Sequence, residues 1–274
     1  MLLGAQLRRL REAKFITREK AGYEIRSSDS KISRMELGRV SFKLRDVADL
    51  LTLYGVEGVD QGRLMGMAKQ ANSPAWWQVY NDVTPTWFQS YLGLEAGASL
   101  IRTYEVQFIP GLLQTPDYAR AVVRIGHGSA PPDEIERRVA LRIHRQELLT
   151  QENPPLLWAM VDEAALRRPI GGKQVMRAQI GALIDAVRSP SVRLQIIPFE
   201  AGGHAATGGA FSILRFADQD LPDIVYVEQL DGAAYLDKPE DVDRYAFAME
   251  RLVVEAEPPS RTAAILGDML RDFD

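Results

Sequence analysis

Cysteine is absent from this sequence, and histidine occurs only three times. Without a thiol, the chain can form neither a disulfide nor a metal site with thiolate ligands. His127, His144 and His204 also show none of the spacings typical of metal ligands. We therefore expect no metal and no cofactor. A chain without cysteine suits the reducing conditions of the cytoplasm.

Long hydrophobic runs are lacking as well. No apolar stretch approaches the roughly 20 residues that a membrane-spanning helix needs. The first residues, MLLGAQLRRLREAK, mix arginines into an amphipathic pattern and do not contain the uninterrupted apolar core of a signal peptide. We therefore expect a cytoplasmic protein with no membrane partner.

The motifs of common catalytic sites are also missing. There is no G-x-S-x-G elbow. The glycine-rich residues 202–209 lack the lysine and hydroxyl residue of a phosphate-binding loop, and they precede a predicted strand. We interpret them as a mobile connection or as a lid over an effector pocket. Asp162, Glu163 and Asp231 follow or end predicted strands, but the sequence does not show that they converge. We expect no catalytic residues and no enzyme activity.

Charge is distributed unevenly along the 274 residues, whose net charge is −4. Residues 1–70 carry 14 basic and 9 acidic side chains, whereas the rest of the chain has 19 basic and 28 acidic ones. A weakly basic N-terminal segment followed by an acidic remainder is typical of a DNA-binding domain joined to a domain that binds a protein or a ligand. The excess of basic over acidic residues in positions 1–70 is small, so DNA binding would depend on a few phosphate contacts from each of two subunits.

Residues 17–38 predict two short helices joined by a tight polar turn. Thr17 can cap the first helix and Ser28 the second, because hydroxyl oxygens accept from free N–H groups in a first turn. Ile32 and Met35 would point inward and leave small and basic side chains outside. This pattern favours a helix-turn-helix that reads the DNA major groove, although any helical hairpin can share it.

The second of these helices would supply the contacts to bases and nearby backbone. Arg34 is the best candidate for reading guanine, since a guanidinium engages two acceptors at once. The contact candidates on this helix are Ser28, Ser30, Lys31, Ser33 and Arg34. Phosphate contacts that set the orientation are predicted for Thr17, Arg18, Arg39, Lys43 and Arg45. We assign Glu36 a structural role, as the partner of an arginine in the first helix of the chain.

Apolar spacing predicts three more helices around this pair, near residues 3–10, 44–54 and 59–70. Five short helices in about seventy residues make a compact all-α domain. Asn72-Ser73-Pro74 then marks a boundary. We expect a DNA-binding domain at residues 1–72 and a second domain at residues 76–274.

The second domain begins with a concentration of aromatic side chains in a chain with only 8% aromatics. Such a cluster favours a core or a buried subunit contact, and an aromatic-lined pocket is the alternative. The candidates for an effector site or interface are Trp76, Trp77, Trp87, Tyr104 and His204.

Hydrophobic patterns in the second domain alternate between helix and strand. Helices are predicted near residues 87–99, 116–125, 133–151, 171–189, 238–257 and 260–274. Strands are predicted near residues 100–108, 154–166, 191–199, 210–216, 223–230 and 233–238. This mixture indicates a mixed α/β (α+β) domain. The arginines of residues 133–151 (Arg137, Arg138, Arg142 and Arg145) are placed on an outer face that is solvated or touches DNA or an acidic partner.

Several N-terminal segments carry a specific resemblance. Residues 7–12, 17–21, 30–39 and 46–56 resemble the lambda-repressor-type, or xenobiotic-response-element-type, helix-turn-helix regulators. Two departures concern the turn and the helix before it. Arg26-Ser27 stands where a glycine and an apolar residue are common, and Gly22 lies in the middle of the first reader helix.

The rest of the chain has a resemblance of its own. The motifs IRTYE at 101–105, IPGLLQT at 109–115, DEAAL at 162–166 and VYVE at 225–228 are similar to the C-terminal domain of many actinobacterial helix-turn-helix regulators. Proteins with this domain are often described as antitoxin-like and sit beside a small partner protein.

The two resemblances together imply a sequence-specific, double-stranded-DNA-binding transcriptional regulator that works as a homodimer. Its C-terminal domain would dimerise and bind a partner or an effector. Two alternatives stay open. One is an antitoxin-like protein that neutralises a small neighbouring protein and autoregulates, and the other is a repressor or activator that senses a small molecule.

Overall fold

The computed structural model describes residues 2–38, 40–218 and 221–273, and the chain divides into two compact units. The first unit comprises residues 1–78 with 218–222, and the second comprises residues 79–217 with 223–274. Arg39, one of the predicted phosphate contacts, lies outside the described residues.

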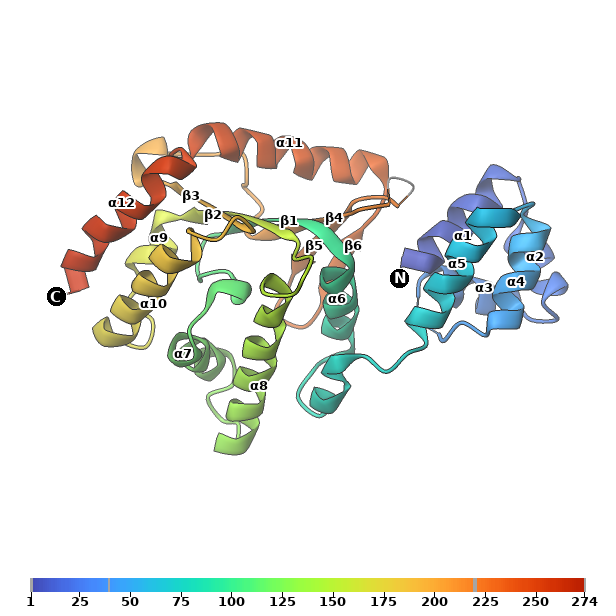
Figure 1. The fold of residues 1–274 in the computed structure, drawn as a ribbon, viewed down its shortest axis with the longest axis horizontal. Coiled ribbons are helices and arrows are strands. Elements are labelled where there is room, and N and C mark those ends of the chain that lie inside the picture. The colour runs from blue at the N-terminus through green and yellow to red at the C-terminus, as the bar shows by residue number, and fades with distance from the viewer. Residues whose placement is uncertain (1, 39, 219–220, 274) are drawn as a thin grey trace. The chain divides into compact units, whose positions relative to one another are not determined.

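The first unit is built from helices, as predicted (Figure 1). Their apolar stripes meet in one core, in which Leu7, Ile32 and Leu50 are almost completely buried. Because the stripes follow helical spacing, burial of one face per helix is enough to hold the unit together. The five helices are α1 (Leu2–Ala13), α2 (Arg18–Glu24), α3 (Asp29–Glu36), α4 (Leu44–Leu53) and α5 (Gly58–Ala71).

The connection between α2 and α3 forms as the capping residues predict. The hydroxyl of Thr17 accepts from the backbone N–H of Lys20 at 3.2 Å, and that of Ser28 accepts from Lys31 N at 3.2 Å. Between the two helices, Arg26 adopts the left-handed conformation with φ of 53°. An arginine in this conformation stores strain that a glycine would not.

The second unit contains a six-stranded mixed sheet in the order β3-β2-β1-β4-β5-β6. β1 (Ala98–Glu105), β2 (Leu156–Asp162) and β3 (Val192–Ile197) are parallel, and the remaining neighbours pair antiparallel. The other strands are β4 (Phe211–Phe216), β5 (Ile224–Glu228) and β6 (Ala233–Leu236). The mixed sheet therefore confirms the predicted α/β (α+β) character of this domain.

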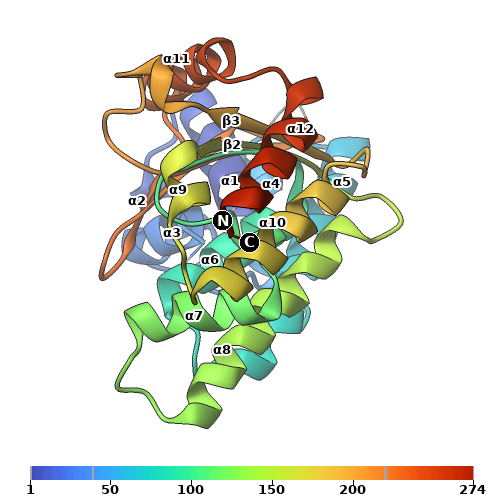
Figure 2. The same ribbon diagram turned by 90° about the vertical axis from the view of Figure 1, so that its left-hand side faces the viewer.

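Helices cover both faces of this sheet (Figures 1 and 2). α11 (Pro239–Glu255) crosses one face and contacts β3 and β5. The opposite face is covered by α6 (Thr86–Gly97), which contacts β1 and β4. Also on this side of the unit are α7 (Pro116–Gly126), α8 (Pro132–Arg145), α9 (Glu163–Arg167) and α10 (Lys173–Ala186).

The outer edge of β3 is closed by the chain that follows α11. Glu257 N–H donates to Ile196 O at 2.8 Å, and Thr262 Oγ1 of α12 (Pro259–Leu270) donates to Leu194 O at 2.6 Å. These bonds occupy carbonyls that would otherwise invite another strand. The edge is thus protected without a further strand.

One prediction for α8 is wrong. Its arginines do not form a solvated outer face, because Arg145 is 7% exposed and is hydrogen-bonded to the buried Glu95. Arg142 is only partly exposed, and Arg137 and Arg138 bind acceptors within the unit. Helical spacing places these arginines beside one another but does not reveal that Glu95 of α6 lies on that side.

Among the described residues, no helix is long and apolar enough to cross a membrane. This agrees with the absence of a long apolar run in the sequence.

Because α2 lies close to the turn that follows it, adding a single methyl group at Gly22 should lower the stability of the first unit. A Cβ added at Gly22 would lie 2.9 Å from Ser27 O and 3.0 Å from the carbonyl carbon of Ser28. Gly22→Ala should therefore destabilise the first unit by about 1–3 kcal/mol, because backbone atoms must move. Chemical unfolding of the full chain measures this.

The matched control is Gly66→Ala in the exposed face of α5, where a Cβ meets nothing within 4 Å. This change should stabilise by about 0.5–1 kcal/mol through helix propensity alone. Equal effects at the two glycines would contradict the close packing of α2 against the turn.

Candidate functional site

The exposed side of α3 carries most of the predicted base-contact residues. Ser30 and Arg34 are exposed and Ser33 is partly exposed, whereas Ile32 and Met35 on the opposite side are 1% exposed. The side chain of Arg34 makes no ion pair or hydrogen bond with any described residue, so its guanidinium can turn toward an external acceptor. The amphipathic pattern therefore places these side chains on the open face of the helix, as predicted.

A buried ion pair fixes α3 against α1. Arg11 of α1 donates to both carboxylate oxygens of Glu36, at 2.5 and 3.0 Å, and also to Ile16 O at 2.8 Å. The hydrogen bond from Arg11 to Glu36 raises the pKa of Arg11 despite its burial. This bidentate geometry confirms the structural role predicted for Glu36.

Tyr54 lies next to this pair and is almost completely buried. Burial and the negative charge of Glu36 raise the pKa of Tyr54. The phenol therefore remains neutral, and the Arg11–Glu36 pair is enclosed by the core. Its charges are poorly screened by solvent in such a position.

Two predicted contact residues already bind carboxylates of their own domain. Lys31 Nζ lies 2.5 Å from Asp46 Oδ2 of α4, and Arg18 Nε lies 3.4 Å from Glu36 Oε2. Lys31 is therefore a tether between α3 and α4, and it must exchange Asp46 for a phosphate or base to bind DNA. Asp46 is not among the residues predicted from the sequence, where its only signal is its place in the first turn of α4.

The remaining candidates, Ser28 for the base and backbone contacts and three residues for the phosphate contacts, lie at the N-terminal ends of α2, α3 and α4. Thr17 and Ser28 are exposed but use their hydroxyl oxygens as helix caps. Lys43 is exposed at the start of α4, and the side chain of Arg45 is 80% exposed, 3.8 Å from Asp49. A surface ion pair of this kind is weak, so Arg45 can readily exchange it for a phosphate.

A feature that sequence reasoning missed lies at the end of α2. Tyr23 is 84% exposed and borders a shallow hollow of about 470 Å³ together with Glu24, Arg26 and Ser27. An exposed tyrosine beside the turn adds a hydrogen-bonding and stacking group next to α3. The only signal in the sequence is an aromatic residue on the polar side of a short helix.

In the second unit, two of the predicted effector residues meet. Tyr104 Oη lies 3.0 Å from His204 Nε2, and the same nitrogen lies 3.7 Å from Asp162 Oδ2. Tyr104 is in β1, Asp162 ends β2, and His204 belongs to the glycine-rich connection between β3 and β4. The glycine-rich residues therefore lie at the carboxyl ends of the parallel strands, where α/β sheets commonly bind ligands.

Hydrogen bonding defines the proton positions in this group. The backbone N–H of Ala206 donates to His204 Nδ1 at 3.3 Å, so that nitrogen acts as an acceptor. In the neutral ring the proton then resides on Nε2, facing Tyr104. Burial, together with Asp162, raises the pKa of Tyr104. The group is a satisfied polar cluster that ties the glycine-rich residues to the sheet.

The predicted tryptophans do not join this cluster. Trp76 and Trp77 belong to the first unit and contact each other edge to face, with ring centroids 5.6 Å apart. Trp87 belongs to the second unit, where its ring contacts Phe88 and its carbonyl accepts from Tyr235. The aromatic concentration in the sequence therefore serves separate local contacts.

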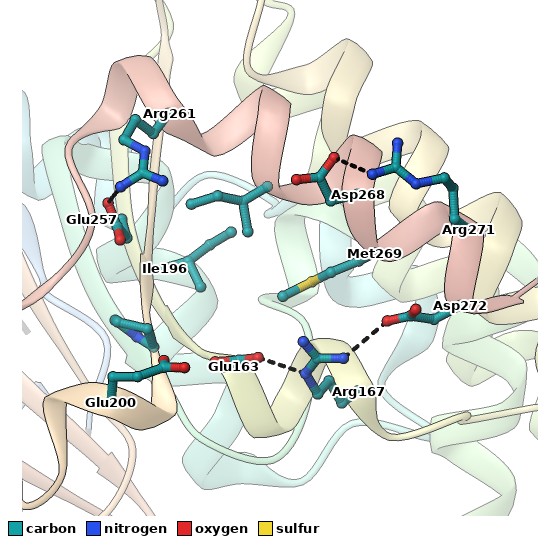
Figure 3. A pocket seen from close by; sticks show the side chains of 12 residues that line it. Glu163, Arg167, Ile196, Glu200, Glu257, Arg261, Asp268, Met269, Arg271 and Asp272 are labelled. Atoms are coloured by element: carbon teal, nitrogen blue, oxygen red, sulfur yellow. Dashed lines mark hydrogen bonds and ion pairs between the residues drawn. The ribbon is translucent and has the colours of Figure 1, made fainter.

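A shallow hollow of about 430 Å³ lies between β3, α9 and α12 (Figure 3). Ile196 and Met269 contribute apolar surface to it. Charged side chains surround this surface, and the arginines among them are already paired, for example Arg167 with Glu163 and Asp272. The acidic residues of the hollow are Glu163, Glu200, Glu257, Asp268 and Asp272, and the basic ones are Arg167, Arg261 and Arg271.

No group of histidine and carboxylate side chains suited to a metal ion occurs among residues 2–38, 40–218 and 221–273.

Comparison with protein-family models gives two matches. A model described as a helix-turn-helix domain matches residues 2–64, and one described as a domain of unknown function (DUF5753) matches residues 88–268. The first match spans α1 to α4 and part of α5, and it supports DNA binding and transcription regulation. Comparisons with curated proteins and with solved structures found no matching chain.

The buried pair behind α3 yields a prediction about stability. Glu36→Gln should destabilise the first unit by about 3 kcal/mol, because Arg11 stays buried without its counter-ion. Asp49→Asn is the control, since the Asp49 side chain is 43% exposed and lies 3.8 Å from Arg45. It should cost less than about 1 kcal/mol. Calorimetry of the full chain measures both, and similar losses would contradict the proposed anchoring of α3.

Proposed function

We propose that this chain, which belongs to the DUF5753 family and begins with a helix-turn-helix domain, is a sequence-specific transcription regulator. It acts in the cytoplasm as a homodimer and has no enzyme activity. α3 of each subunit enters the major groove, and the second domain dimerises and receives a partner or an effector.

One observation carries this proposal. Arg34 projects from the open side of α3 without an internal partner among the described residues, while Glu36 and Ile32 hold the same helix from behind. A reading helix needs a rigid base and unpaired polar side chains on its other face. Ser30 and Ser33 provide short hydrogen-bonding groups on either side of Lys31.

The proposed dimer follows from the size of the contact surface. A single short helix supplies few base and phosphate contacts, whereas two subunits double them. Two copies of α3 would read successive major grooves about 34 Å apart, so the operator should be a pseudo-palindrome. Footprinting on the region upstream of the gene locates such a site.

Arg34→Ala tests the assignment of the reading face. Loss of a bidentate guanine contact should weaken operator binding by about 1–3 kcal/mol and relax selectivity at one base position. Binding of random DNA should change much less. Fluorescence anisotropy with the operator and with scrambled DNA measures both, and equal losses on the two would assign Arg34 to the backbone.

Arg45→Ala is the matched comparison, because its predicted contact is to a phosphate. Binding should weaken to a similar extent on operator and scrambled DNA. The slope of log affinity against log salt should fall by about one for each phosphate that the variant no longer neutralises. An unchanged salt slope would exclude Arg45 from the interface.

We propose a small partner protein as a second ligand, favoured by the hollow between β3, α9 and α12 (Figure 3). It combines apolar surface with more carboxylates than guanidinium groups, which suits a basic amphipathic segment. Glu200 is exposed at its edge and has no ion-pair partner among the described residues.

Co-expression with any small protein encoded next to the gene tests this second role. The wild-type chain should co-purify with it, and Glu200→Lys should weaken the complex by opposing a basic partner. Glu152→Lys, at an exposed position outside the hollow, serves as the control. Equal co-purification of all three chains would place the partner elsewhere.

A further inference from the structure

α11 presents an exposed row of side chains on the side that faces away from the sheet. Its inner side is held in place, because Met249 and Leu252 are completely buried in the core between the helix and the sheet. On the outer side, Phe247 is 67% exposed and Val254 is 80% exposed. No other helix or strand of the second unit covers this side within the described part of the chain (Figures 1 and 2). The outer side of α11 is therefore a rigid and open surface.

The exposed positions of α11 follow a seven-residue spacing. We call them the outer row, which consists of Glu240, Asp243, Arg244, Phe247, Glu250, Arg251 and Val254. At about 100° per residue, Glu240 and Val254 lie within about 20° of Phe247 around the helix axis. A single exposed apolar residue is common on protein surfaces and needs no explanation. Two apolar residues seven positions apart on one line are the arrangement through which parallel helices pack.

Charged side chains are sorted by sign on the two flanks of this line. Asp243 and Glu250 lie about 40° and about 60° to one side of Phe247 around the helix axis. Arg244 and Arg251 lie about 60° and about 40° to the other side. All four charged residues are exposed. One flank of the line is therefore acidic and the other is basic.

Such a surface is complementary to a second copy of itself in one orientation. When two copies of α11 run parallel about a two-fold axis between them, the acidic flank of each faces the basic flank of the other. Arg244 then lies level with Asp243 of the partner subunit, and Arg251 lies level with Glu250 of the partner subunit. In the antiparallel orientation flanks of like charge would face each other, which is unfavourable.

The ion pairs already present within α11 do not prevent this contact. Arg244 lies 3.9 Å from Asp241, and 77% of its side chain is exposed. Arg251 lies 3.6 Å from Glu255, and 57% of its side chain is exposed. Ion pairs of such exposed side chains are weak, so a carboxylate of the partner subunit can replace or share them.

The two glutamates of the outer row differ in their surroundings. Glu250 accepts through Oε1 from the buried Arg102 of β1 at 2.8 Å, which orients its carboxylate on the acidic flank. Glu240 would face Glu240 of the partner subunit, a contact between like charges. It stands in the first turn of α11, where the positive end of the helix dipole compensates a negative charge. The apolar line and the flanking charges therefore outweigh this one contact.

We infer that the outer row of α11 is a dimer contact of the second domain, in which two copies of the helix pack in parallel. Phe247 and Val254 of each subunit contact the same residues of the partner, because the two-fold axis runs along the helices. The charges on both flanks select the parallel orientation. This inference rests on the homodimer of the proposed function and assigns the surface that forms it.

Cysteine substitution tests the contact directly, since the chain has no cysteine of its own. Phe247→Cys and Val254→Cys should each form an intermolecular disulfide under mild oxidation, because parallel packing brings each position next to its own copy. Ile125→Cys, at a 59% exposed position of α7, is the control and should remain a monomer on the gel. Non-reducing electrophoresis of the full chain measures the linked fraction. Linkage at only one of the two α11 positions, or at neither above the control, would overturn the inference.

A charge swap tests the orientation without changing the apolar line. Arg244→Asp should weaken the dimer by about tenfold at low salt, because it would face Asp243 of the partner subunit in both halves of the contact. Adding Asp243→Arg to the same chain restores opposite signs and should recover the wild-type dissociation constant. Analytical ultracentrifugation of the full chain measures both. A single variant as tight as the wild type, or a double variant without recovery, would contradict the parallel pairing.

Operator binding separates this inference from the proposed function. Phe247→Glu should weaken the dimer by at least about tenfold, because the symmetric contact would bury the new charge twice. A dimer that Phe247→Glu disrupts but that binds no operator would count against the proposed function and leave the α11 contact intact. A wild type that binds its operator as a dimer unaffected by Phe247→Glu would overturn the contact and leave the proposed function intact.

Discussion

The position of α3, the proposed reading helix, depends on one buried ion pair. Arg11 and Glu36 join the first and third helices through two charge-assisted hydrogen bonds, and Arg11 also holds the carbonyl of Ile16 before α2. A single guanidinium thus joins α1, the residue just before Thr17 and α3. Because both charges are enclosed, a shifted α3 would leave them unpaired in a poorly solvated place. The outer face of α3 can remain polar and open to solvent because its inner face is held so firmly.

In the second unit most buried charged and polar groups are also paired, with one exception. There Glu95 and Arg145 form a satisfied pair between α6 and α8, and Tyr104, His204 and Asp162 tie the glycine-rich residues to the sheet. Arg142 is the exception, since it is brought beside Arg145 without a carboxylate of its own among the described residues. Paired charges of this kind hold the architecture of the unit together.

Much of the fold follows from local patterns. Helical spacing and caps predict α1 to α5, and the strands of the second unit emerge from short apolar runs bounded by turn residues. The polar face of α3 is predictable for the same reason, because Ile32 and Met35 point into the core. The surroundings and partners of charged side chains do not follow from local patterns in the same way. Helical spacing put Arg142 and Arg145 on an outer face, and it did not indicate that Lys31 would bind Asp46.

Apart from α9, which forms where the pattern predicts the end of a strand over residues 154–166, the sequence by itself determined the helices and strands, the helix-turn-helix with its two caps, and the side of α3 that is polar. These depend on residues within a few positions of one another. Only the tertiary structure decided which charges are paired and which are left over, because the partners lie 15 to 50 residues apart in pairs such as Lys31–Asp46 and Glu95–Arg145. An ion pair needs atoms within a few ångströms, and sequence spacing alone does not define that distance across packed elements.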